Sequence, residues 1–352
     1  MTKTLKPIHV AVLGLGRAGW DIHVAALRKD RRFKVVAVSD PLAERREQAE
    51  QELGCESYRT PKALLRDAKA DLVVNATPSQ LHAPLSIEAM KAGFHVALEK
   101  PVARNLAEAR RLVRAASTSK RQLFMHHNYR FMAVTRHLRD IKDSGLIGDL
   151  FEIHVNVSAF SRRNDWQTLR KNNGGLLNNH GTHYIDMMMH VMDSPVIDVW
   201  SDMKLVSDAG DAEDHVRVLL KTRSGCVADF FLSTSSAMEM PQYRLLGTCG
   251  TAVCDGGETT IRYFDPRKVK SQSVLKAAPA GRQYGNADKL PWREKTMKAT
   301  SKDKTTFYDN VYDVLRRRKA MFVTPESVLD VLSVMEQCKG PIRDLRPVYG
   351  GK

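Results

Sequence analysis

The chain has 352 residues, of which 43% are hydrophobic and 27% are charged. That length exceeds the range in which one hydrophobic core usually keeps growing, so two domains are expected, and the composition excludes a disordered chain. No apolar run approaches the roughly 20 residues needed to cross a bilayer, and no small-residue cleavage site follows the basic start. We therefore expect a cytoplasmic protein that does not enter a membrane.

The formal net charge of +15 at pH 7 raises the question of nucleic-acid binding, because Lys and Arg contacts to phosphate dominate such complexes. The basic residues are spread along the chain with acidic residues between them, however, and no aromatic-basic motif accompanies them. We expect no nucleic-acid partner, and a solvated basic surface suited to attract anionic substrates. Five scattered cysteines without a CxxC pair predict neither a disulfide framework nor a zinc site.

Strand-like and helix-like segments alternate through the first third of the chain, a pattern typical of βαβ units and a parallel sheet. The expected strands are residues 8–13, 33–39, 71–76, 94–98 and 122–125. Apolar residues at helical spacing predict helices at 43–53, 81–92 and 106–117. The fold class is therefore α/β, beginning with a Rossmann-type doubly wound parallel sheet.

Longer strand-like runs without intervening helices follow from about residue 150, and they predict a C-terminal α+β domain with a largely antiparallel, open-faced sheet. The expected strands are residues 151–160, 215–222, 227–233 and 257–264, and the expected helices are 176–192, 307–319 and 325–337. Residues 268–305 are polar and predict a long surface excursion. We place the dinucleotide-binding domain at 1–127 and the substrate and oligomerisation domain at 128–352.

A glycine-rich run stands directly after the first strand and opens a helix: Gly14, Gly16 and Gly19, with Arg17 and Ala18 between them. In a GxGxxG run the first glycine permits the tight turn, the second lets a pyrophosphate approach the backbone, and the third lets helix and strand pack closely. Unpaired N–H groups at the helix N-terminus complete an anion site. These residues predict a dinucleotide-binding loop.

Asp40 follows the last of these glycines by 21 residues, at the end of the second strand. A carboxylate there accepts hydrogen bonds from the adenosine ribose, which favours NAD over NADP. Arg45 and Arg46 lie just beyond, however, where they could meet a 2′-phosphate. NADP use therefore stays open, although such a pair more often forms a solvated helix face.

Two further motifs lie one strand apart. Thr77 and Pro78 open a turn that reaches His82, and the next strand ends in Glu99-Lys100-Pro101. At this point the sequence resembles the Gfo/Idh/MocA family of oxidoreductases. The resemblance covers nearly the whole chain, because residues 128–131, 174–186 and 307–314 are also similar to the family.

The resemblance implies roles for these motifs. Lys100 would contact both nicotinamide and substrate, Glu99 would hold the nicotinamide ribose, and the Lys100–Pro101 bond would be cis. Thr77, Pro78 and His82 would complete the cofactor site. The physical chemistry agrees for the lysine, since desolvation beside a cofactor lowers its pKa and lets it polarise or deprotonate a hydroxyl.

A second signature starts at Gly174-Gly175 and resembles the family pattern GG-x3-D-x-G-x-H-x2-D, which places the acid–base histidine at His183. A neutral imidazole can take a hydroxyl proton as hydride leaves the same carbon. The chain departs from the pattern at Asn179, where many members have aspartate. Because asparagine cannot act as a base, the proton work is assigned to Lys100 and His183.

The spacing of His180, His183, Asp186 and His190 invites a metal interpretation. Gly181 interrupts the ligand run, however, and no HExxH arrangement is present. We predict no metal, and expect Asp186 and His190 to support helix packing.

Substrate contacts are expected from Asn128, Tyr129 and Arg130 and from the loop that carries Arg162 and Trp166. Asn179 and His183 would add to them. Such a mixture suits sugar hydroxyls and a carboxylate. A solvated charged loop anchored by Trp166 explains the same residues equally well.

Three functions stay open. The favoured one is an NAD(P)-dependent dehydrogenase or reductase acting on a CH–OH group of a sugar, polyol or sugar acid. The second, which the resemblance permits, is an NAD-retaining sugar hydrolase or lyase that oxidises a ring carbon transiently. The third is a non-catalytic sugar sensor, against which both Lys100 and His183 argue. We also expect a homodimer or homotetramer, because one face of the second sheet lacks an evident cover.

Overall fold

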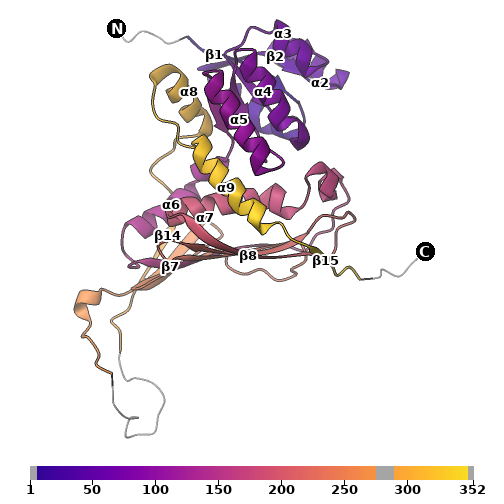
Figure 1. The fold of residues 1–352 in the computed structure, drawn as a ribbon. Coiled ribbons are helices and arrows are strands. Elements are labelled where there is room, and N and C mark those ends of the chain that lie inside the picture. The colour runs from indigo at the N-terminus through magenta and orange to yellow at the C-terminus, as the bar shows by residue number, and fades with distance from the viewer. Residues whose placement is uncertain (1–5, 275–288, 348–352) are drawn as a thin grey trace, which may run out of the picture.

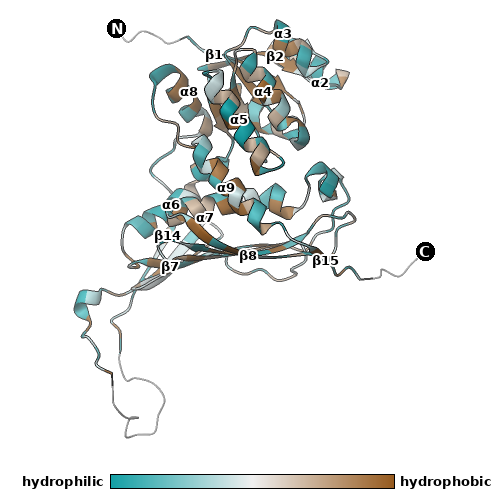
Figure 2. Cartoon of the chain, viewed as in Figure 1, coloured by the Kyte–Doolittle hydropathy of each residue, from teal (hydrophilic) through white to brown (hydrophobic). Residues whose placement is uncertain are grey.

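A computed structural model describes residues 6–274 and 289–347. It contains two sheets, each with its own layer of helices, joined through the chain segment after β6 (Figure 1). Figure 2 shows hydrophobic residues concentrated on the strands of the first sheet and on the helix faces that meet a sheet. Both regions therefore have the layered architecture that the sequence predicted.

The first sheet has six parallel strands in the order β3-β2-β1-β4-β5-β6. They are β1 (Ile8–Leu13), β2 (Phe33–Ser39), β3 (Glu56–Tyr58), β4 (Leu72–Asn75), β5 (His95–Leu98) and β6 (Leu123–Met125). Most central positions are apolar and buried, as expected for strands covered on both faces. The strand order reverses between β1 and β4, the point at which such sheets open a crevice for a ligand. The predicted Rossmann sheet is confirmed.

Helices connect these strands and cover the sheet (Figure 1). They are η1 (Ala18–Val24), α1 (Ala25–Leu27), α2 (Ala43–Leu53), α3 (Pro61–Asp67), η2 (Ser79–Leu81), α4 (His82–Lys91) and α5 (Leu106–Thr118). Side-chain caps explain where two of them begin: Thr60 accepts from the backbone N–H of Ala63, and Asn105 accepts from that of Glu108. The element η1, directly after the glycine-rich loop, has π-helical hydrogen bonding.

The second sheet has nine strands in the order β14-β13-β12-β11-β7-β10-β9-β8-β15. They are β7 (Leu150–Ser158), β8 (Val196–Leu205), β9 (His215–Thr222), β10 (Val227–Ser233), β11 (Tyr243–Gly247), β12 (Gly250–Asp255), β13 (Glu258–Tyr263), β14 (Arg293–Lys298) and β15 (Ile342–Asp344). All neighbouring pairs are antiparallel except β7 with β10 and β8 with β15. The predicted largely antiparallel sheet is confirmed.

One face of this sheet packs against helices, as Figure 1 shows for α6, α7 and α9. The helical elements after β6 are η3 (Asn128–Phe131), α6 (Ala133–Asp143), η4 (Trp166–Thr168), η5 (Arg170–Asn172), η6 (Leu177–Gly181), α7 (Thr182–Met192), η7 (Pro266–Lys268), α8 (Phe307–Arg317) and α9 (Pro325–Cys338). Large side chains on the strands, Phe151, Ile197 and Trp200, are about half exposed.

Helix α8 returns to the first sheet. Phe307, Tyr308, Val311 and Tyr312 are buried in the same hydrophobic cluster as the residues of β1 and β2. A capping box between Thr306 and Asp309 starts the helix. The division at residues 127 and 128 stays a prediction, and α8 shows that a single cut in the sequence does not describe how the two regions pack.

The surface excursion predicted at residues 268–305 is wrong in part, because β14 lies within it and pairs with β13. Every residue of β14 except one is exposed, so the strand has no alternating apolar pattern that would reveal it. Residues 275–288 of the excursion lie outside the described residues.

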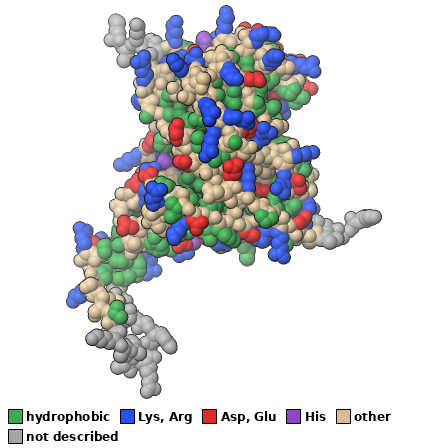
Figure 3. Space-filling model, viewed as in Figure 1, with side chains coloured by type: hydrophobic (Ala, Val, Ile, Leu, Met, Phe, Trp, Pro, Cys, Tyr) green, Lys and Arg blue, Asp and Glu red, His purple; other side chains and the backbone are tan. Residues whose placement is uncertain are grey.

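Across residues 6–274 and 289–347, no helix is both long and apolar enough to span a bilayer. Basic side chains are dispersed over the face shown in Figure 3, with acidic ones among them.

Candidate active site

The glycine-rich loop has the shape that a dinucleotide requires. Gly14 adopts a φ of +85°, and a Cβ on it would lie 2.7 Å from the carbonyl oxygen of Ala76. A Cβ on Gly19 would collide with the carbonyl oxygen of Gly14, whereas at Gly16 the nearest heavy atom would be 4.0 Å away. The first and third glycines thus permit close packing, and the second leaves space for a pyrophosphate. Arg17 and Ala18 lie between these glycines, at the start of η1.

Asp40 lies beside this loop at the end of β2. Its Oδ2 accepts from the backbone N–H of Leu15 at 2.8 Å and its Oδ1 from that of Leu42 at 3.0 Å. The Arg45 guanidinium approaches the same carboxylate at 3.4 Å. The carboxylate is therefore oriented by the loop that would hold the pyrophosphate, as the ribose-binding role requires.

The turn after β4 lies against the segment after β5. The Thr77 hydroxyl donates to Asn75 Oδ1 at 2.6 Å, and Pro78 lies exposed beside it. His82 is buried, with Nε2 2.7 Å from the Thr77 carbonyl oxygen and Nδ1 2.7 Å from that of Pro101. His82 thus joins the two loops, and the cofactor-binding role expected of it stays a prediction. The Lys100–Pro101 bond is cis, as predicted.

Glu99 lies at the centre of a buried network. Its Oε1 lies 3.0 Å from His23 Nε2 and 2.6 Å from His126 Nδ1, and its Oε2 accepts from the Lys100 backbone N–H at 3.0 Å. The other nitrogen of His23 lies 2.7 Å from the Tyr308 hydroxyl on α8. Burial opposes the charge on Glu99, but the two histidines outweigh it and hold the pKa of the carboxyl well below its usual value.

This network adds to the role expected of Glu99. Its Oε1 already lies against both histidines, whereas Oε2 has one partner, the Lys100 N–H, so the expected bond to a nicotinamide ribose would fall to Oε2 and stays a prediction. Sequence reasoning also missed His23, His126 and Tyr308, although the His126-His127 pair directly after β6 was a visible signal. The network connects η1, β5, β6 and α8 beneath the loop that carries Lys100.

Among the described residues, His23, Glu99 and His126 are also the group whose ligand atoms lie close enough together to hold a metal ion, within 4.8 Å of one another. Their mutual hydrogen bonds, at 2.6 and 3.0 Å, already account for this geometry. The other candidate set consists of His180, His183, Asp186 and His190. Within it, Asp186 pairs with Arg130 and His190 lies against Arg139. The expectation of no metal stays a prediction.

Lys100 extends from the end of β5 to the helix of the second region. Its Nζ donates to the main-chain carbonyl oxygen of Asn179 at 2.8 Å. Burial lowers the pKa of the lysine from its ordinary value, and the positive charge of Arg17 adds to this while Glu99 opposes it. A desolvated amine with a lowered pKa is suited to exchange a proton with a hydroxyl.

His183 is buried on α7 and is 7% exposed. Its ring stacks on Tyr129, with centroids 4.3 Å apart and planes 14° from parallel. Its Nδ1 is buried and has no hydrogen-bond partner among the residues that the structure describes. Burial and the neighbouring Lys100 lower the pKa of the imidazole to about 2, so the ring is neutral at physiological pH.

Asn179 and His183 lie on either side of the junction between η6 and α7. The element η6 is π-helical, and such turns occur frequently at functional sites. Asn179 contacts Lys100 through its backbone carbonyl group, whose position depends on this turn. The structure therefore brings Lys100, Asn179 and His183 together, as the two sequence signatures suggested.

Arg130 has a different role from the predicted one. It is buried, and its guanidinium binds the Asp186 carboxylate and the Ser327 hydroxyl. His127 Nδ1 lies 3.2 Å from the same carboxylate. Burial opposes the charge of Asp186, but His127 and Arg130 outweigh it and bring its pKa to about 2. This pair holds η3 against α7 and leaves Arg130 poorly placed to bind a substrate.

The remaining predicted substrate contacts lie in two places. Asn128 and Tyr129 lie on η3, and the Asn128 Oδ1 atom is buried without a partner among the described residues. Arg162 and Trp166 lie on the loop after β7, where Trp166 is 47% exposed. The adjacent Arg163 is close enough to contribute to the lowered pKa of His180, after burial and Lys100. The loop thus borders the site on the His180 side.

Comparison with known proteins agrees with this geometry. The model of an oxidoreductase family with an NAD-binding Rossmann fold matches residues 8–127, and the model of the GFO/IDH/MocA C-terminal domain matches residues 135–253. The protein is therefore an oxidoreductase with an NAD-binding Rossmann domain. The chain belongs to the GFO/IDH/MocA family, as the motifs around Lys100 and His183 indicated.

Two curated relatives and one solved structure show the extent of the similarity. The chain is 29% identical over 276 residues to a myo-inositol 2-dehydrogenase of Thermotoga maritima, covering 76% of this chain and 81% of the relative. It is 30% identical over 269 residues to a D-apiose dehydrogenase of Paraburkholderia graminis, covering 74% and 68%. An NAD-binding protein from Listeria innocua superimposes with a TM-score of 0.80 at 25% identity, over 94% of this chain and 93% of that one.

Proposed function

We propose that the protein transfers hydride between NAD(H) and a hydroxyl-bearing carbon of a sugar, polyol or sugar acid. The observation that carries the proposal is the convergence of the desolvated Lys100 amine and the neutral His183 imidazole beside the dinucleotide loop. The relatives named for oxidation of inositol and apiose support the substrate class. The reaction requires a proton acceptor for the hydroxyl, and these two residues are its candidates.

NAD⁺, when bound, supplies the hydride acceptor. The substrate hydroxyl loses its proton as its carbon–oxygen bond becomes double. Neutral Lys100 accepts that proton at Nζ, and the lowered pKa makes the neutral amine available nearer physiological pH than in a solvated lysine. An imidazole with a pKa near 2 holds a proton poorly, so His183 accepts a hydrogen bond from the hydroxyl and orients it.

The cofactor preference is for NAD. Asp40 is already oriented by the N–H groups of Leu15 and Leu42, so its carboxylate is preorganised for two ribose hydroxyls. A 2′-phosphate would meet this buried negative charge at close range. The Arg45 guanidinium against it is partly exposed and lies beside the carboxylate, and the Arg46 guanidinium donates to the carbonyl oxygens of Asp40 and Pro41. Like-charge repulsion therefore disfavours NADP.

The test has two stages. The purified protein is first denatured to see whether NAD or NADH is released, and a panel of sugars, polyols and sugar acids is then screened for the change in NADH absorbance. Aryl glycosides in the same screen report phenol release. Redox turnover that Lys100→Met abolishes and Lys91→Met on the surface of α4 retains supports the proposal. Phenol release without net NADH would instead identify the NAD-retaining hydrolase or lyase, and the proposal would be wrong.

Self-association through the second sheet is a further part of the proposal. The exposed Trp200 on β8 is paired with Leu219 on β9, on the face of the sheet opposite the buried Val218 and Leu220, and apolar side chains exposed together on one surface commonly mark interfaces. We expect a dimer or tetramer by light scattering at micromolar concentration and a smaller species for Trp200→Glu. A wild-type monomer would contradict this.

A further inference from the structure

Gly174 and Gly175 open the signature that carries His183, and each of them packs closely against another segment. A Cβ on Gly174 would collide with the carbonyl oxygen of Gln167. Gly175 has a φ of +97°, and a Cβ on it would collide with the carboxyl group of Glu213. The second glycine is therefore needed for the close approach of a glutamate that lies far from it in the sequence.

Glu213 holds the start of η6 with both its main chain and its side chain. Its backbone carbonyl oxygen accepts from the N–H of Leu176 at 3.0 Å, and its Oε1 accepts from the N–H of Leu177 at 3.0 Å. N–H groups at the start of a helical segment have no partner within it, so the carboxyl group satisfies one of them as a side-chain cap does. Because Glu213 lies between β8 and β9, this contact fixes η6 to the second sheet.

This glutamate occupies a buried position, where it is 6% exposed. Burial raises the pKa of its carboxyl group, whereas hydrogen bonds from backbone N–H groups and the positive charges of Lys339 and Arg170 oppose the shift. A buried polar group costs free energy unless it is hydrogen-bonded. The hydrogen bond to the start of η6 is a contact that offsets this cost.

The turn η6 carries the effect of this contact to the acid–base centre. Asn179 follows Leu177 within the turn, and its backbone carbonyl oxygen accepts from Lys100 Nζ at 2.8 Å. The N–H of Asn179 donates to the Gly175 carbonyl oxygen at 3.0 Å, and the same helical run continues into α7, which carries His183. A shift of the turn at its first residues would therefore move the oxygen that holds the Lys100 amine.

We propose that Glu213 is a positioning residue for the proton transfer at Lys100, because it fixes the turn that carries the carbonyl oxygen bound to this amine. This rests on the proposed function, in which Lys100 accepts the hydroxyl proton. Glu213 acts through main-chain atoms and exchanges no proton with the substrate. Gly175 serves the same arrangement, since a side chain at that position would displace the carboxyl group.

The kinetic test compares two substitutions of the same residue. Glu213→Gln retains an oxygen that can accept from the Leu177 N–H, whereas Glu213→Ala leaves that N–H unpaired. With a substrate from the sugar screen, Glu213→Ala should lower kcat about tenfold, the effect of a small misplacement of a reacting group, and leave the KM for NAD unchanged. Glu213→Gln should retain most of the wild-type kcat. Equal losses of kcat in the two variants, or a loss confined to KM, would overturn the proposal.

Two further measurements need no sugar oxidation, so that failure of this inference is distinguishable from failure of the proposed function. Hydrogen exchange reports on the backbone amides of η6, which should exchange about tenfold faster in Glu213→Ala. Timed acylation followed by mass spectrometry gives the pH at which the Lys100 amine becomes reactive. That midpoint should move up toward the value of an ordinary lysine, because loosening of η6 lessens the burial that lowers the Lys100 pKa.

The other groups that act electrostatically with this amine are the same in the variant and the wild type: Glu99, Arg17, His180 and His183. Asp71→Ala is the matched control. The Asp71 carboxylate also accepts a main-chain N–H, that of His9 at 3.0 Å, but at the amino ends of β1 and β4, whereas Lys100 follows the carboxyl end of β5. This control should leave both the η6 exchange and the Lys100 midpoint at their wild-type values.

A second variant covers the case in which Glu213→Ala does not fold. Glu213→Asp sets the carboxyl group back from the Leu177 N–H by one methylene and should shift both readouts in the same direction by a smaller amount. Unchanged exchange in η6 would show that the contact does not hold the turn. Faster exchange with an unchanged Lys100 midpoint would show that Glu213 stabilises η6 alone, and either result would contradict the positioning role.

Discussion

Main-chain atoms shape the dinucleotide loop at residues 14–19, whereas side chains from distant segments form the centre around Lys100 and His183. In the loop, function depends on a positive φ at Gly14 and on the space left at Gly16. In the acid–base centre it depends on burial, which lowers the pKa of both titratable groups. The loop is therefore a matter of local conformation, and the acid–base centre is a matter of tertiary packing.

The largest effect is expected at the acid–base centre. Lys100→Met should lower kcat/KM by roughly 10² to 10⁴, the usual contribution of a positioned acid or base, while NAD affinity stays within a few fold. Because neutral Lys100 is the active form in the oxidation direction, wild-type kcat/KM should rise with pH and level off below the pH at which an ordinary lysine titrates. Stopped-flow and steady-state rates across pH check this. A rising limb that persists in Lys100→Met would assign the base elsewhere.

At the dinucleotide-binding loop we expect a smaller effect, on cofactor affinity. Asp40→Ser removes a carboxylate that the loop already orients, and two charge-assisted hydrogen bonds are worth a few kcal/mol. NAD should bind roughly ten- to a hundredfold more weakly, and the gap to NADP should narrow. Titration calorimetry with both cofactors measures this, with Asp30→Ser as a control variant away from the loop. Tighter binding of NADP than NAD by the wild type would refute the preference.

The pH dependence of the unfolding free energy gives a separate test of the acid–base centre. The folded-state pKa of His183 is about 2 and its ordinary value is 6.5, so the unfolded chain binds a proton that the folded chain does not. The stability it contributes is complete above pH 6.5 and is lost as the pH falls toward 2. Between pH 6.5 and 5 the wild type should lose about 1.6 kcal/mol more unfolding free energy than His183→Gln. Urea unfolding at both pH values measures the difference, and parallel losses would contradict it.

The smallest effect is expected at Asn179. Its contact with Lys100 is made by the backbone carbonyl, which Asn179→Ala retains, so the side chain contributes at most one or two hydrogen bonds of about 1 kcal/mol each. We expect kcat/KM to fall about fivefold, well below the loss in His183→Ala. If both substitutions lowered kcat/KM equally while NAD binding was unchanged, the roles assigned to His183 and Asn179 would be wrong.

The contrast also explains which predictions from sequence were accurate. The loop at 14–19, the place of Asp40 and five of the six strands of the first sheet follow from local rules: glycine conformation, strand ends and apolar runs. Strand β14 was missed because its sequence, Arg293–Lys298, is almost wholly exposed and polar. It is a strand because its backbone pairs with β13, an interaction that side-chain periodicity does not report.

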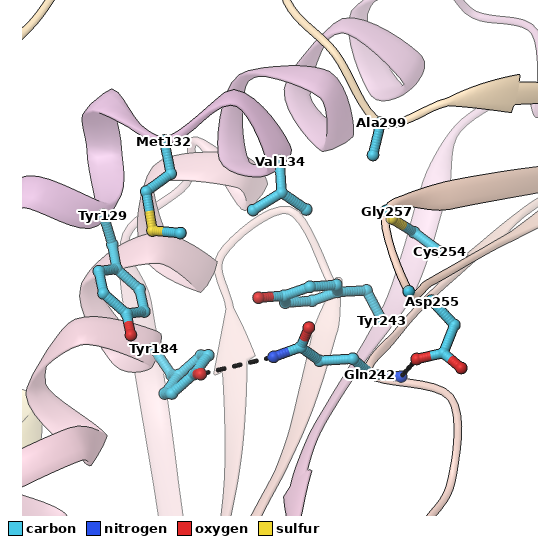
Figure 4. Close-up of a pocket in the computed structure, with 11 residues that line it drawn as sticks. Tyr129, Met132, Val134, Tyr184, Gln242, Tyr243, Cys254, Asp255, Gly257 and Ala299 are labelled. Carbon is cyan, nitrogen blue, oxygen red and sulfur yellow. Dashed lines mark hydrogen bonds between the residues drawn. The ribbon is translucent and has the colours of Figure 1, made fainter.

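The sequence by itself determined the family, the two-sheet architecture and the motifs that bring Lys100 and His183 into one site. Only the tertiary structure decided what the other motif residues contact. Arg130 binds Asp186, which lies 56 residues later in the sequence, and Glu99 contacts His23, which lies 76 residues earlier. A buried polar group must find a partner or lose free energy, and which partner lies within reach depends on packing between segments far apart in the chain. For the same reason the pocket lined by Tyr129, Tyr184 and Tyr243 (Figure 4), whose walls come from η3, α7, the start of β11 and the turn after β12, has no linear signature.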